Sequence, residues 1–323
     1  MGIQVLVMVF HMRIGLLDES PDRDAETGAP ADVLWQLPDT LTDGEREQLV
    51  RAVRDYRGRD LRVRELFEDG MPAELMEDPM FAQCERLYLA GGDGTVHLAV
   101  QESIPSREIG LLPRGTGNDL ARGLDLPVDD WEALVRVAVT GVPRPIDLGL
   151  LNQGRFVNAV TIGFGAEATK DLSGEFKSWA GSFGYALYTS WKALRAKPFE
   201  LTVETAEETW KGEVWALVLI NGRTVGGGLE VGRISRPDDG KLDLVWLPRI
   251  GVGQGGVGEI LGDVREPDPE AFEKLEYRQG QHFRLRFSRS VAASIDGETS
   301  DLSRLDAEIL PEALTILQPS RDA

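Results

Sequence analysis

The 323-residue sequence has one cysteine, Cys84, and only three histidines. A single cysteine excludes an intrachain disulfide and a cysteine-ligated zinc site. The absence of disulfides is typical of a cytosolic chain. Lysine is also scarce, because only seven occur and none precedes Lys170. Any anion site in the first half of the chain must therefore use arginine side chains or backbone N–H groups.

Long hydrophobic runs are absent as well. The apolar run at residues 3–10 is too short to span a bilayer, and no basic segment precedes it as a signal peptide requires. We therefore predict a buried strand at residues 3–10. We expect a cytoplasmic protein whose contact with membranes is peripheral.

Acidic residues exceed basic ones by a wide margin. The chain has 54 Asp and Glu against 35 Lys and Arg, a formal net charge of −19. Such a surface repels the phosphate backbone, so we exclude a general nucleic-acid binder. With 42% hydrophobic and 28% charged residues, the composition is globular and fits one large domain or two of ordinary size.

Residues 1–145 alternate strand-like and helix-like patterns, which predicts a mostly parallel α/β domain. The predicted strands are residues 3–10, 87–90 and 109–112, and the predicted helices are near 44–57, 96–103, 117–123 and 129–139.

Residues 146–304 show period-two alternation instead, which predicts an antiparallel β domain. The clearest strands are residues 199–205, 214–220, 241–247 and 282–287, while a helical pattern at 175–196 interrupts them. Residues 308–318 predict a further strand. The sequence leaves open whether the segment of about 305–323 returns to the first domain.

The first chemical motif follows the strand at 87–90 and reads Gly91-Gly92-Asp93-Gly94-Thr95. Glycines let a backbone approach a ligand closely, and the N-terminus of the helix that follows presents free N–H groups to phosphate. Asp93 adds a ligand for a divalent cation and Thr95 adds a hydroxyl. The alternative is a glycine-rich turn that only shapes the chain.

A second motif follows the strand at 109–112 and reads Pro113-Arg114-Gly115-Thr116-Gly117-Asn118-Asp119. In an open α/β sheet, ligands lie beyond the carboxyl ends of the strands, so the two loops are predicted to converge on one phosphate-bearing ligand. Asn118 and Asp119 would also suit ordinary helix caps. That alternative does not explain the preceding Gly-Thr-Gly.

Together the two motifs resemble the diacylglycerol kinase catalytic domain family, which includes bacterial lipid kinases and the sphingosine and ceramide kinases. The first motif is shared with NAD kinases and phosphofructokinases, whereas the second is typical of lipid kinases. The resemblance covers roughly residues 85–318, and its further matches lie at 145–149, 156–165, 226–228, 239–243 and 294–298.

This resemblance implies a two-domain enzyme, in which an NAD kinase- and phosphofructokinase-like α/β domain faces a β-sandwich that binds the lipid. It implies transfer of the γ-phosphoryl group of ATP, with Mg²⁺, to a lipid hydroxyl. By position, Asp296 would be the base, with Glu298 beside it. Considered without the family, Asp296-Gly297 is an ordinary turn. The implied nucleotide-binding residues are Gly91, Gly92, Asp93, Gly94, Thr95, Gly115, Thr116, Gly117, Asn118 and Asp119.

A metal site is implied in the second domain too. Asp239-Gly240-Lys241-Leu242-Asp243 resembles the family segment that holds a structural Mg²⁺. Two carboxylates across a glycine turn suit a hard cation, although a solvated turn is the equal alternative. The predicted metal ligands are therefore Asp93, Asp239 and Asp243.

Two departures from the family pattern stand out. Members usually carry a further phosphate loop, Asn-Pro-x-Ser-Gly, after the first strand, and residues 9–15 do not match it. His97 and Leu98 follow the first glycine loop, where bacterial members often have Asn-Glu. We interpret His97 as a packing or capping residue.

Residues 170–197 combine basic and aromatic side chains in an otherwise acidic protein. Five cations and two carboxylates give this segment a local charge of +3, and it contains six aromatic residues. It is expected to contact the membrane surface that carries the lipid substrate. The alternative is a helix packed on the β domain, and a homodimer is left open.

We expect the acceptor to be a neutral lipid alcohol, diacylglycerol, giving phosphatidic acid, because the chain shows no device for a charged head group. The alternatives are a kinase for a sphingoid base or another lipid, an NAD kinase, and a non-catalytic nucleotide-binding regulatory protein. The non-catalytic alternative is considered because residues 9–15 do not match the phosphate loop that family members usually carry after the first strand.

Overall fold

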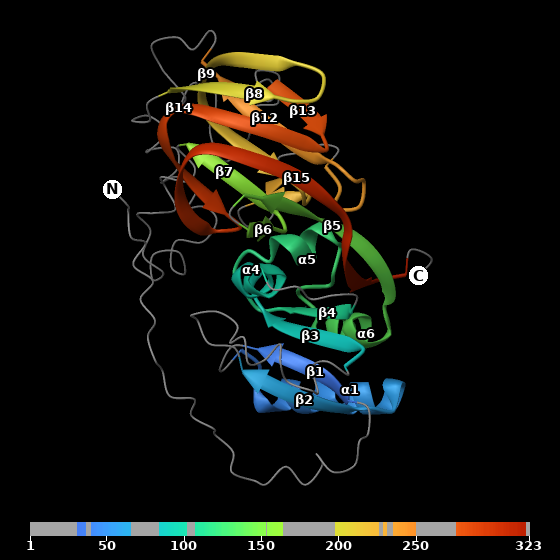
Figure 1. The fold of residues 1–323 in the computed structure, drawn as a ribbon. Helices are drawn as coiled ribbons and strands as arrows, with labels where there is room; N and C mark the ends of the chain where they lie inside the picture. The colour runs from blue at the N-terminus through green and yellow to red at the C-terminus, as the bar shows by residue number, and fades with distance from the viewer. Residues whose placement is uncertain are drawn as a thin grey trace, which may run out of the picture.

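The computed structural model describes residues 31–36, 40–65, 84–101, 107–152, 154–163, 198–225, 229–230, 235–249 and 276–320. The predicted strand at 3–10 and the basic aromatic segment at 170–197 lie outside these ranges. Figure 1 shows two regions. The first is an α/β region that contains β1 to β4, and the second, drawn above it, is composed of strands.

The first region is built on four parallel strands, in the order β2–β1–β3–β4. Strands β3 and β4 are buried along almost their whole length, as expected for strands covered on both faces. The strands are β1 (Ala31–Gln36), β2 (Asp60–Glu65), β3 (Arg86–Gly91) and β4 (Glu108–Pro113).

Helices connect and cover these strands, and the four predicted from the sequence are confirmed within a few residues at each end. They are α1 (Asp43–Arg57), α4 (Asp93–Gln101), α5 (Asp119–Gly123) and α6 (Trp131–Thr140). Thr42 and Glu45 form a capping box at the start of α1, and Gly58 ends it with φ 62°. None of the helices in the described ranges is long and apolar enough to cross a bilayer.

The second region is antiparallel throughout. Strand β9 pairs with β12 on one side, while β8 and β7 pair with successive parts of β9 and of β14 on the other. Trp246 and Phe283 are among the largest side chains of its core. The main strands are β5 (Val142–Leu151), β6 (Gly154–Phe156), β7 (Ala159–Gly163), β8 (Phe199–Glu204), β9 (Thr209–Ile220), β12 (Leu242–Pro248), β13 (Glu276–Gly280), β14 (His282–Ile295) and β15 (Glu298–Gln318), and a separate hairpin joins β10 (Thr224–Val225) to β11 (Leu229–Glu230).

Two long strands, β5 and β15, run through both regions (Figure 1). The first part of β15 pairs with β14, and its last part pairs in parallel with β4. The register between β15 and β5 shifts between Leu310 and Leu314, where Glu312 has φ 52°. Ile309 lies in the core of the second region and Leu314 in the core of the first. The end of the chain therefore completes the sheet of the first region.

Candidate active site

The two glycine loops pack against each other, backbone to backbone, at the ends of β3 and β4. The N–H of Arg114 donates to the carbonyl of Gly91 at 2.8 Å. A Cβ on Gly115 would lie 2.6 Å from the Cα of Gly92, and a Cβ on Gly92 would lie 2.9 Å from the Cα of Gly115. Neither position accepts a side chain unless the loops separate, so the glycines are needed for this contact.

Little space remains beneath the loops. The cavity between them and the helices that follow is about 10 Å³, room for one water molecule at most. This space is too small to hold a nucleotide.

Asp93 joins the first loop to the helix that follows the second. Its Oδ1 accepts a hydrogen bond from the N–H of Leu120 at 3.3 Å, at the start of α5. Asn118, at the N-cap position of α5, makes no side-chain cap hydrogen bond. Asp93 thus serves as the cap that α5 lacks locally.

Burial raises the pKa of the Asp93 carboxyl, and the negative charges of Asp119 and Asp296 raise it further. The backbone N–H groups of Asp119 and Leu120 partly offset this effect. A carboxylate that is short of positive neighbours is a fitting ligand for a divalent cation.

The other residues of the two loops differ in their hydrogen bonds and in how far they are buried. The Asn118 side chain closes the second loop, because Oδ1 accepts from the Gly115 N–H and Nδ2 donates to the Gly115 carbonyl, both at 2.8 Å. Thr95 is buried, and its hydroxyl has no hydrogen-bond partner in the structure. A buried hydroxyl without a partner, beside a glycine loop, fits a hydrogen bond to a bound phosphate. Thr116 and Gly94 are exposed.

Asp296 lies at the tip of the hairpin that joins β14 to β15. Asp296 and Gly297 have φ 48° and 101°, the positive values of a two-residue hairpin turn, and Ile295 pairs with Glu298. The interpretation as an ordinary turn therefore describes the backbone correctly. The side chain is nevertheless only 1% exposed. Glu298, at the start of β15, is exposed.

The Asp296 carboxylate is held by four donors. Oδ2 accepts from the N–H of Val157 at 2.7 Å, and Oδ1 accepts from the N–H groups of Asn158 and Ala159 at 2.9 and 3.1 Å. The fourth partner is Nδ1 of His97, 3.1 Å from Oδ2. A carboxylate offers about four lone-pair positions, so all are occupied.

The interpretation of His97 as a packing or capping residue is correct only in part, because the side chain is largely buried but does not cap the helix. The residue lies in the second turn of α4, beyond the cap, and its ring contacts a carboxylate 199 positions later in the chain. No local pattern signals a partner at that distance. The contact joins the helix that begins in the first glycine loop to the β14–β15 turn of the second region.

Two further links at this junction have no signal in the sequence. The Gln101 side chain accepts from the Arg155 N–H at 2.9 Å and donates to the Arg155 carbonyl at 2.7 Å. The Arg155 guanidinium in turn donates to the carbonyls of Val100 and Gln101 at the end of α4. The Thr224 hydroxyl donates to the carbonyl of Asp119 at 2.9 Å. Both glycine loops are therefore tied to the second region.

The second predicted metal site lies at the turn before β12. Nε2 of Gln279 lies 3.3 Å from Asp239 Oδ2 and 3.2 Å from Asp243 Oδ1, so both carboxylates face one amide. Asp243 is fully buried, and its Oδ2 has no partner. Burial and the charge of Asp243 raise the pKa of the Asp239 carboxyl.

A cation bound at this turn would give Asp243 Oδ2 a partner and would offset the repulsion between the Asp239 and Asp243 carboxylates. The carboxylate of Asp147 is already used, because it accepts from the N–H groups of Gly240 and Glu312. Within the described ranges, no three His, Cys, Asp or Glu side chains are grouped as metal ligands. Asp239 and Asp243 would therefore need carbonyl oxygens or water to complete the coordination of Mg²⁺.

The contact between the loops can be tested with a matched pair of glycine substitutions. Gly115→Ala is expected to force the loops apart and lower the Tm, because its Cβ would meet the Gly92 backbone. Gly94→Ala is the control, since nothing lies within 4 Å of a Cβ there. Thermal unfolding followed by circular dichroism measures both. Equal Tm values for the two variants would contradict the packing.

Comparison with known proteins places this site in a family. Residues 42–151 match the model of the diacylglycerol kinase catalytic domain, and residues 158–318 match that of the YegS C-terminal NAD kinase beta sandwich-like domain. The chain is 35% identical over 284 residues to a probable lipid kinase YegS-like protein of Pseudomonas syringae pv. syringae (strain B728a), covering 85% of this chain and 90% of that protein. It is 30% identical over 286 residues to a protein of the same description from Chromohalobacter salexigens, with 86% and 90% covered.

A solved structure shares the fold. A putative diacylglycerol kinase from Bacillus anthracis str. Sterne superposes with a TM-score of 0.74 at 20% identity, over 92% of this chain and 100% of that one. The predicted combination of an α/β domain with a β-sandwich is thereby confirmed. With the glycine loops, the buried Asp296 and two family models that together span most of its length, the chain belongs to the diacylglycerol kinase catalytic domain family of lipid kinases.

Proposed function

We propose that this protein transfers the γ-phosphoryl group of ATP to the hydroxyl of diacylglycerol, giving phosphatidic acid and ADP. The observation that carries the proposal is the position of Asp296. This buried carboxylate of the second region contacts the helix that begins in the first glycine loop, so an acceptor for a proton lies beside the loop that we propose to bind phosphate.

In the proposed reaction the lipid hydroxyl oxygen bonds to the γ-phosphorus while the bond to the oxygen between the β- and γ-phosphorus breaks. The hydroxyl proton passes to Asp296. Bound Mg²⁺ would neutralise charge on the phosphoryl oxygens, and Asp93 would hold it, since burial and nearby carboxylates leave it short of positive neighbours. Thr95 would donate its unpaired hydroxyl, and the loops would donate backbone N–H groups, because lysine is absent from the first 169 residues.

A hydroxyl must displace one donor to reach Asp296, since all four lone-pair positions are occupied. Three of these donors are backbone N–H groups of residues 157–159, which belong to the same region as Asp296. His97 is a side chain on the opposite region and is the donor able to withdraw. We infer that the substrate hydroxyl takes the place of His97 at Oδ2.

If the substrate hydroxyl takes the place of His97, substitutions of Asp296 and of His97 should affect the reaction rate differently. Asp296→Asn removes the proton acceptor and is expected to lower kcat by about 100-fold or more. His97→Ala leaves the acceptor in place, so kcat is expected to stay of the same order as wild type, while the Tm falls because a link between the regions is lost. Both are measured by transfer of labelled phosphate to diacylglycerol in vesicles, below the Tm of each variant.

Other results would change the account in defined ways. A wild-type rate in Asp296→Asn would contradict the role of Asp296. A loss in His97→Ala as large as that in Asp296→Asn would show that the proton passes through the imidazole rather than directly to the carboxylate.

We also propose that Asp239 and Asp243 hold a second, structural Mg²⁺. A raised carboxyl pKa means that Asp239 favours folding only at low pH, and that this contribution is lost as the pH rises through the raised value. At neutral pH the ionised carboxylate therefore opposes folding in the absence of a cation.

Asp239→Asn tests this site. The substitution is expected to raise the Tm at neutral pH in the presence of a chelator, and to remove the further rise that Mg²⁺ gives to the wild type. Asp129→Asn, an exposed carboxylate on the loop before α6, is the control. An Mg²⁺-dependent rise that persists in Asp239→Asn would contradict the site.

A further inference from the structure

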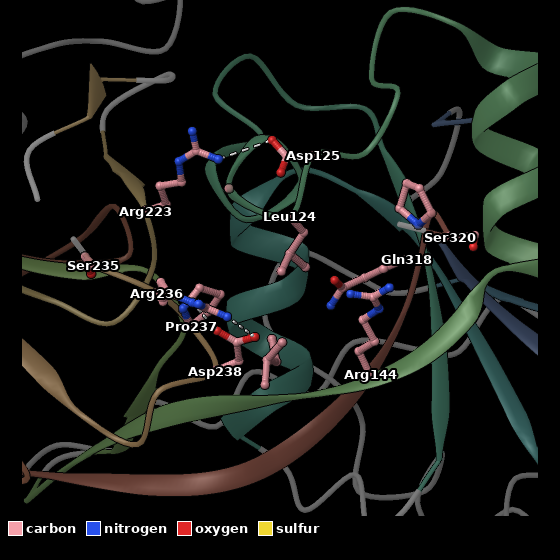
Figure 2. A pocket seen from close by; sticks show the side chains of 13 residues that line it. Leu124, Asp125, Arg144, Arg223, Ser235, Arg236, Pro237, Asp238, Gln318 and Ser320 are labelled. Carbon is pink, nitrogen blue, oxygen red and sulfur yellow. Dashed lines mark hydrogen bonds and ion pairs between the residues drawn. The ribbon is translucent and has the colours of Figure 1, made fainter. Parts of the chain in front are cut away.

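A separate cavity of about 750 Å³ lies where the two regions meet (Figure 2). Its wall is formed by the residues that follow α5, the start of β5, the residue before β10, the loop 235–238 and the chain end at 318–320. None of the residues of the two glycine loops lines it. Its volume is within the range of small-molecule sites in proteins, and junctions between domains are a common place for them.

Three arginines and two carboxylates line this cavity. Arg223 lies 3.3 Å from Asp125, and Arg236 binds Asp238 through Nε and Nη2 at 2.9 and 3.0 Å. The third arginine, Arg144, has no carboxylate of its own. The wall therefore has an excess of positive charge in a protein whose net charge is −19.

Arg144 is the unusual member of the set. It is half-buried on β5, and within the described ranges its side chain makes no hydrogen bond or ion pair. Arg144 pairs with Ile316 and Val142 pairs with Gln318, so Arg144 and Gln318 share one face of the two strands. Figure 2 shows both side chains directed into the cavity. A guanidinium that faces the cavity without a carboxylate partner is available to bind an anion there.

We propose that this cavity binds a phosphate group. A guanidinium presents two parallel N–H groups that match two phosphate oxygens, so Arg144 would bind it bidentately, with the Gln318 amide as a further donor. Arg236 keeps Nη1 for the same ligand, because its bonds to Asp238 use the other two nitrogens. The carboxylates of Asp125 and Asp238 hold their arginines in position and limit the site to an anion of low charge.

The cavity is connected to the glycine loops by a short path. Helix α5 begins at Asp119, in the second loop, and ends at Gly123, on the wall of the cavity. Arg223 precedes Thr224, whose hydroxyl binds the carbonyl of Asp119. A bound phosphate would bridge β5, β15 and the loop 235–238, and it is therefore expected to stabilise the junction of the two regions.

The test uses the full chain and inorganic phosphate, with chloride at equal ionic strength as the reference. We expect phosphate to raise the Tm of the wild type in a saturable way, and Arg144→Gln to abolish that rise. Arg136→Gln is the matched control, because Arg136 is an exposed arginine on α6 whose side chain pairs with Glu132 in the same helix. A rise of equal size in Arg144→Gln, or no rise in the wild type, would overturn the proposal.

Thr95→Val separates this site from the glycine loops. A phosphate effect that Thr95→Val removes and Arg144→Gln keeps would place the anion at the loops and overturn the proposal. No kinase assay is involved, so the result is independent of the reaction proposed above.

A second arm identifies the source of the phosphate. Sedimentation with neutral vesicles, with and without phosphatidic acid, compares wild type with Arg144→Gln. Weaker binding of the variant only to vesicles that contain phosphatidic acid would assign the cavity to a lipid phosphate. Equal vesicle binding, together with the loss of the phosphate effect on Tm, would assign it to a soluble phosphate compound.

Discussion

The buried carboxylate of Asp296 is the interaction on which the arrangement of the two regions depends. A charge that is 1% exposed is tolerated only when hydrogen bonds replace its water, and here three backbone N–H groups and one imidazole do so. These donors come from two pieces of the chain. The segment 157–159 is held under the β14–β15 turn, and α4 is held against both.

This arrangement makes the first glycine loop and the turn with Asp296 parts of one assembly. Helix α4 begins at Asp93 in the loop and carries His97 and Gln101 on its later turns. The glycines bring the two loops into backbone contact, and Asp93 caps the next helix. Backbone contacts and carboxylates therefore hold this junction together. Lysine side chains have no part in it, because the first region contains none.

The sequence predicted the elements whose signals are local. Periodicity located the four helices and strands such as β4, and the rule that ligands lie beyond the carboxyl ends of strands brought the two glycine loops together. The family resemblance singled out Asp296, although the residues alone indicated only a turn. Both interpretations describe the same hairpin, because the tight turn is what directs the carboxylate into the junction.

The features that sequence reasoning missed all depend on distant contacts. His97 meets Asp296 across 199 positions, and Gln101 meets Arg155 across 54. The predicted strand at 308–318 is the last half of a strand that starts at Glu298. Ile309 of this strand packs in the core of the second region and Leu314 in the core of the first. The arginine cavity likewise collects residues from five segments, none of which forms a motif.

We propose that the junction between the glycine loops and Asp296 performs phosphoryl transfer to a lipid alcohol. The most direct measurement incubates the full chain with labelled ATP and Mg²⁺ and offers diacylglycerol, sphingosine or ceramide in vesicles, or NAD in solution. We expect labelled phosphatidic acid from diacylglycerol and no labelled product from NAD. Labelled product from NAD alone, or no transfer to any acceptor, would contradict it.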